Sequence, residues 1–69
     1  MAEPVYEIIQ MVGTSSNGIE DAIQNAIQKA NETLKQIKWF EVIETRGAVE
    51  EGNIQVWQVR LKIGFEVED

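Results

Sequence analysis

The sequence contains neither cysteine nor histidine. A disulfide is therefore excluded, and so is a structural zinc site, because such sites are built mainly from those two residue types. The chain has only 69 residues, and a fold of this size buries little apolar surface to offset the conformational entropy lost on folding. Self-association is the stabilising contribution that remains.

Basic residues are also scarce. Six Lys and Arg residues stand against twelve Asp and Glu residues, so the formal net charge is -6 at pH 7. A negative surface without a run of basic residues repels phosphate backbones. The composition therefore argues against nucleic acid as a partner.

Long apolar runs are missing as well. No stretch approaches the roughly 20 apolar residues of a membrane-spanning helix, and the N-terminal sequence MAEPVYE lacks the apolar region of a signal peptide. The absence of cysteine fits a reducing compartment. Together these features predict a cytoplasmic protein without a membrane partner.

The clearest feature that is present is an amphipathic segment, Gly18–Trp39, which predicts one long helix that runs directly into a tryptophan. Asn17 followed by Glu20 indicates a capping box at its start, with Ser15 or Ser16 as alternative caps. Apolar residues recur at spacings of three and four and predict the buried side of this helix: Ile19, Ala22, Ile23, Ala26, Ile27, Ala30, Leu34 and Ile37.

Three other segments are typical of strands. Val5–Val12 is rich in β-branched and aromatic residues, and Trp39–Ala48 returns to that composition after the helix. In Ile54–Val67 apolar and polar residues alternate, and Glu50–Asn53 is a turn signal that would join the last two strands as a hairpin. We therefore predict an α+β fold in a single domain over residues 1–69: a β-α-β-β protomer whose three-stranded antiparallel sheet wraps one long helix.

One helix covers only one side of such a sheet, and the other side is expected to carry both Trp39 and Gln58. A large aromatic ring beside an amide suits a flat heterocycle, because the indole offers a stacking surface and the amide forms hydrogen bonds with the ring edge. The alternative is that Trp39 merely packs in a subunit contact, where tryptophan is enriched. Residue types alone leave both interpretations open.

The chain resembles the dodecins, a family of small flavin-binding proteins, along nearly its whole length. The resemblance rests on VYEIIQMVGTS, then a helical segment, then WFEV followed by RG, and finally WQVRLKIGFEVE. It implies a β-α-β-β protomer and a hollow homododecamer. It also implies that pairs of flavins are stacked between tryptophans of two subunits at two-fold contacts.

By position, the resemblance implies that Trp39 stacks on the isoalloxazine, that Gln58 hydrogen-bonds to its polar edge, and that Arg46 lies near the flavin phosphate. Glu66 stands where some relatives have a second arginine, and a carboxylate there would repel a phosphate. FMN and riboflavin are therefore both candidate ligands, and coenzyme A, which some bacterial members bind, is a further candidate. The implied function is flavin storage or sequestration, with quenching of the bound flavin's photochemistry.

Two other functions compete with flavin storage. A flavin-dependent oxidoreductase is disfavoured because the chain has no histidine or cysteine to act as an acid-base group or nucleophile. A homo-oligomeric shell without a ligand, in which Trp39 only packs, is the second alternative. We predict no catalytic residues and no metal site, and we expect the partners to be further copies of the chain and a flavin.

Overall fold

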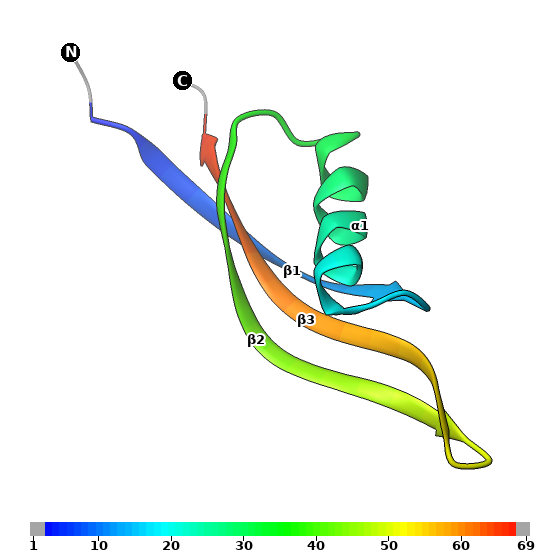
Figure 1. Cartoon of the computed structure of the whole chain (residues 1–69). Helices are drawn as coiled ribbons and strands as arrows, with labels where there is room; N and C mark the ends of the chain where they lie inside the picture. Colours follow the sequence, from blue (N-terminus) through cyan, green and yellow to red (C-terminus); the bar gives the residue numbers. More distant parts are fainter. Residues whose placement is uncertain (1–2, 68–69) are drawn as a thin grey trace.

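The computed structural model describes residues 3–67, so the outermost two residues at each end of the predicted domain lie outside the described residues. Four elements follow one another along the chain (Figure 1): β1 (Val5–Ser15), α1 (Ile19–Asn31), β2 (Ile37–Glu50) and β3 (Asn53–Val67). This order confirms the predicted β-α-β-β arrangement.

The three strands form one antiparallel sheet in the order β1-β3-β2, so the last strand of the chain is the central one. Leu61 on β3 pairs with Met11 on one side and with Val42 on the other. Val59, Leu61 and Ile63 are completely buried, as expected if the apolar residues of the alternating segment Ile54–Val67 face the helix.

The helix lies on β1 and β3 (Figure 1). Its fully buried residues are Ala22, Ala26 and Ala30, one small side chain per turn along the side that meets the sheet. Gly13 lies beneath them on β1, where a Cβ atom would overlap the carbonyl oxygen of Ala22 and approach Ala26 Cβ to 2.9 Å. Small residues on both surfaces therefore let the helix lie directly against the strand. Larger apolar residues pack around this contact: Ile9, Met11, Ile23, Ile27, Leu34 and Ile37.

The predicted end of the helix is wrong. The helix ends at Asn31, and the N–H groups of Thr33 and Leu34 both donate to the carbonyl oxygen of Ala30, at 3.2 and 2.8 Å, in a tightened last turn. The chain then passes through Gln36, whose φ is 63°, and enters β2 at Ile37. Strand pairing with β3 replaces the helical hydrogen bonds from Ile37 onward, although the apolar spacing continues unchanged.

The predicted capping box is wrong as well. Gly18 is the N-cap residue and no side chain caps the helix. Ser15, which is buried, instead donates its hydroxyl hydrogen to the Asp21 carboxylate at 2.7 Å and accepts a hydrogen bond from the Asn17 N–H at 2.9 Å. The cause is that β1 continues to Ser15, beyond the predicted end at Val12, and this strand pairing holds Ser15 outside the helix.

The hairpin between β2 and β3 is confirmed. Glu51 and Gly52 form its two central residues, with φ values of 50° and 79°. Positive φ at both positions is typical of a type I′ turn, whose twist matches that of the adjoining strands. The hairpin end extends beyond the helix (Figure 1), so nothing from α1 covers it.

Strand β2 is exposed on the helix side of the sheet too. Val42 pairs with buried Leu61 and Phe40 pairs with buried Ile63, yet Val42 is 41% exposed and Phe40 46% exposed, because the helix packs mainly on β1 and β3. Three irregularities in the pairing also bend this strand, between Ile37 and Trp39, Val42 and Glu44, and Ala48 and Val49. A wide apolar surface is therefore uncovered in the single chain.

Candidate ligand-binding face

Trp39 lies near the start of β2, opposite Gly64 of β3. A Cβ atom added to Gly64 would overlap the indole ring, so the ring lies across the bare backbone of the central strand. Gly64 alternates with buried Ile63, and Trp39 therefore lies on the side of the sheet that faces away from the helix. At 39% exposure, the indole keeps a substantial part of its surface open.

Tyr6 supports the indole from the far strand. The rings of Tyr6 and Trp39 form an edge-on pair, with centroids 5.1 Å apart and an interplanar angle of 71°. Edge-on contacts are a preferred aromatic arrangement and limit how the indole can turn. Tyr6 and Gly64 together position the Trp39 indole. The alternation of residues along the strands had predicted only the side of the sheet on which this ring lies.

Sequence reasoning missed both supporting residues. A glycine within a long alternating strand was a usable signal, because strand glycines mark points of close approach. Tyr6 carried no such signal, because its contact with Trp39 depends on the register of β1 and β2 with β3.

Gln58 and Arg46 form the second part of the face. They are directly opposite each other on β3 and β2, and the Arg46 Nε–H donates to Gln58 Oε1 at 2.7 Å. Glu44 lies one step further along the same side, with its carboxylate 4.0 Å from Arg46 Nη1 and 3.6 Å from Arg60 Nε. Arginine, amide and carboxylate side chains thus form a continuous polar row.

The structure confirms that Trp39 and Gln58 share the uncovered side, but it does not bring them together. Trp39 pairs with Gly64, six positions along β3 from Gln58, which corresponds to about 20 Å of strand. A flat heterocycle on Trp39 therefore cannot reach Gln58 of the same chain.

Glu66 lies near the indole end of the face. It pairs with Tyr6, and its carboxylate is 4.0 Å from Lys38 Nζ. Both side chains are partly exposed, so this ion pair contributes little to stability, on the order of 1 kcal/mol or less. The carboxylate has a basic neighbour in its own chain.

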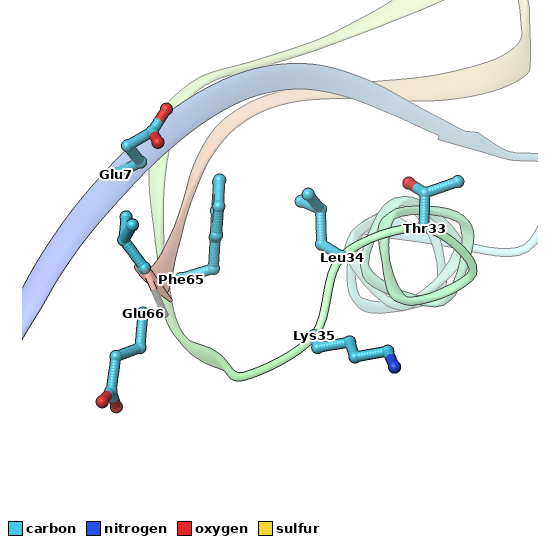
Figure 2. A pocket seen from close by; sticks show the side chains of 7 residues that line it. Glu7, Thr33, Leu34, Lys35, Phe65 and Glu66 are labelled. Atoms are coloured by element: carbon cyan, nitrogen blue, oxygen red, sulfur yellow. The ribbon is translucent and has the colours of Figure 1, made fainter. Parts of the chain in front are cut away.

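A hollow of about 280 Å³ opens on the other side of the sheet (Figure 2). Leu34 points toward Phe65 across it, whereas Lys35 points away, and Glu7 stands at its edge on β1. The hollow lies where the chain leaves the helix for β2, and no residue of the predicted site lines it. Sequence reasoning did not identify it, because it depends on the early end of the helix.

Two further properties concern the part of the chain that the structure describes. Between residues 3 and 67, no helix is long and apolar enough to cross a bilayer. Over the same residues, no three acidic side chains gather closely enough to hold a metal ion.

These features define a small α+β protein that presents an oriented indole on the free side of a helix-backed sheet. The sequence model of the family described as Dodecin matches residues 5–68. The chain belongs to the dodecin family.

Several relatives resemble the chain along nearly its whole length. A curated protein named Dodecin, from Thermus thermophilus, is 45% identical over 65 residues, which cover 94% of each chain. The solved structure of dodecin from Streptomyces davaonensis is 41% identical and superposes with a TM-score of 0.94, covering 99% of this chain and 100% of the other. Calcium dodecin from Mycobacterium tuberculosis is 30% identical over 63 residues, which cover 91% of this chain and 89% of that protein.

Proposed function

We propose that the protein binds flavin and stores or sequesters it, without turning it over, at contacts between subunits of a homododecamer. One observation carries the proposal: in a chain of the dodecin family, the Trp39 indole is held over Gly64 and against Tyr6 with part of its surface open. An oriented aromatic ring with a free surface suits stacking on an isoalloxazine. Trp39 is the stacking residue in this proposal, and Gln58 donates or accepts at the polar edge.

The distance between these two residues supports a site shared by subunits. Because Trp39 and Gln58 are about 20 Å apart along β3, a ring system that contacts both must take them from different chains. A two-fold contact presents the same surface from both sides, so it would offer one indole from each subunit. In this proposal each of the two indoles stacks on one flavin of a pair.

The exposed apolar surface supports assembly. Phe40, Val42 and Ile43 on β2 are between 39% and 46% exposed, and Ile8 and Val12 on β1 are about half exposed. Monomeric proteins rarely leave apolar patches of this extent in water. Further copies of the chain would cover them and supply the stability that one short protomer lacks.

The ligand in this proposal is FMN or riboflavin, with coenzyme A as a further ligand of the same assembly. The resemblance implies that Arg46 lies near a phosphate, while Glu66, which is paired with Lys38, adds a negative charge near the indole that would oppose one. Riboflavin carries no phosphate and avoids this repulsion. The calcium in the name of the M. tuberculosis relative belongs to that protein, and we do not extend it to this chain.

A flavin fluorescence titration tests the proposal. We expect the protein to quench riboflavin or FMN emission, because a stacked indole donates an electron to the excited flavin. Trp39→Ala should weaken binding by about 5- to 150-fold, which corresponds to the loss of about 1–3 kcal/mol of stacking. Trp57→Phe is the matched control, since Trp57 lies on the helix side of the sheet, opposite Gly47.

Each alternative gives a different result in the same samples. Unchanged flavin emission with the parent protein would favour a shell without a ligand. Steady oxidation of a reduced nicotinamide above the rate of free flavin would favour an oxidoreductase.

A further inference from the structure

Arg46 contacts a residue of the proposed flavin site within its own chain. Its Nε–H donates to Gln58 Oε1 at 2.7 Å, which is a short, charge-assisted hydrogen bond. The two residues are directly opposite each other on β2 and β3, so the strand register itself brings them together. Both partners of the contact belong to the same chain.

The chemistry of the guanidinium decides how the Gln58 amide is turned. A guanidinium has five N–H donors and no acceptor, so only the amide oxygen can face it. The reverse orientation would set N–H groups against N–H groups and lose the hydrogen bond. The Gln58 NH₂ group therefore points away from Arg46.

Glu44 lies near the arginine, two residues before it on β2. Its carboxylate lies 4.0 Å from Arg46 Nη1 and also 3.6 Å from Arg60 Nε. Arg46 is thus placed between an amide and a carboxylate of its own chain, and Glu44 offsets part of its positive charge. An arginine engaged in this way is better suited to orient a neighbour than to hold a phosphate.

The geometry points to Arg46 as a positioning residue for Gln58, which fixes the amide so that its N–H donors meet a carbonyl oxygen or ring nitrogen on the polar edge of a flat heterocycle. This inference rests on the proposed function, because Gln58 must contact the flavin ring for its orientation to matter. Since the effect acts at the ring and not at the side chain of the ligand, it applies equally to riboflavin and FMN.

Comparing the two ligands distinguishes this role from phosphate binding. Arg46→Met keeps a long side chain and removes every hydrogen-bond donor. It should weaken the binding of riboflavin and the binding of FMN by the same factor, about 2- to 12-fold, as expected for one hydrogen bond. Lys29→Met is the control for lost positive charge, because Lys29 lies on α1, on the other side of the sheet from Gln58, and its carboxylate partner is Glu32. The control should leave riboflavin binding unchanged.

A double-mutant cycle shows whether Arg46 acts through Gln58. In a Gln58→Ala background, Arg46→Met should cause no further loss of riboflavin affinity, because the group that it orients is gone. Arg46→Ala replaces Arg46→Met if the latter does not assemble, as judged by size-exclusion chromatography against the parent.

Three results would overturn the inference. Arg46→Met could lower the affinity for FMN alone, it could leave the affinity for both ligands unchanged, or its effect could simply add to that of Gln58→Ala in the double variant. A parent protein that fails to bind riboflavin and FMN would instead overturn the proposed function, and this inference with it. The parent titration therefore separates the two failures.

Discussion

Gly64→Ala would introduce a methyl group where the Trp39 indole now lies. The new Cβ would be 2.6 Å from Cδ2 of the ring and closer still to two other ring atoms, whereas ordinary contact begins at 3.4 Å. The ring must therefore shift or turn away from the central strand. A displacement on the order of 1 Å is enough to spoil a preorganised binding surface.

Two energies decide what this change does to stability and to binding. Overpacking usually lowers the free energy of unfolding by about 1–3 kcal/mol, but the Trp39 indole is 39% exposed and can move toward water. In addition, alanine is more favourable than glycine in a strand by about 0.5–1 kcal/mol. The net loss of stability should therefore be small. Flavin stacking, in contrast, should lose about 1–3 kcal/mol, or about 5- to 150-fold in Kd.

The assay measures riboflavin affinity and tryptophan emission on the same samples, in a Trp57→Phe background so that Trp39 is the sole emitter. We expect weaker riboflavin binding together with a red shift of the emission as the indole becomes more exposed. Gly18→Ala is the matched control, because a Cβ there meets nothing within 4 Å and its φ is that of extended backbone. Unchanged emission and unchanged affinity in Gly64→Ala would refute the account of how Trp39 is held.

Two further substitutions test the fold. Gly13→Ala should lower the free energy of unfolding by about 1–3 kcal/mol, measured by urea denaturation, because its Cβ would overlap the backbone of the helix at Ala22, which cannot move as a side chain can. A denaturation midpoint equal to that of the parent would contradict this packing. Glu51→Asn should raise the unfolding free energy by roughly 0.5–1 kcal/mol, since asparagine accepts the positive φ of this turn position more readily than glutamate. A lower midpoint would show that the hairpin does not adopt a type I′ turn.

Much of the sheet could be predicted from the sequence because its signals are local. The alternation in β3 fixes which side chains face the helix, and Val59, Leu61 and Ile63 are buried accordingly. The hairpin follows from the turn residues at Glu51 and Gly52. Both features depend on the backbone geometry of a few consecutive residues.

The end of the helix could not be predicted in the same way. Leu34 and Ile37 continue the apolar spacing of the helix, and both pack against the core, but they do so from a turn and a strand. The apolar spacing predicts which residues are buried, but a buried residue can belong to a helix, a turn or a strand. Pairing between Ile37 and Phe65 decides the matter, and that contact is remote in sequence.

The sequence predicted on which side of the sheet the candidate site lies, but not how far apart its residues are. Alternation placed Trp39 and Gln58 on the same side of the sheet, and the structure confirms this. Their separation along β3, and the contacts of Trp39 with Gly64 and Tyr6, depend on a register that irregular pairing in β2 sets. The roles of Trp39, Gln58 and Arg46 toward a ligand stay predictions.

The most direct test of the account is the native mass of the purified protein, measured by light scattering on a size-exclusion column after incubation with riboflavin, with flavin absorbance followed in the same run. The account predicts a dodecamer that carries flavin, and a Trp39→Ala variant that elutes at the same mass without it. A folded single chain that elutes apart from the flavin and leaves its fluorescence unchanged would contradict the central claim.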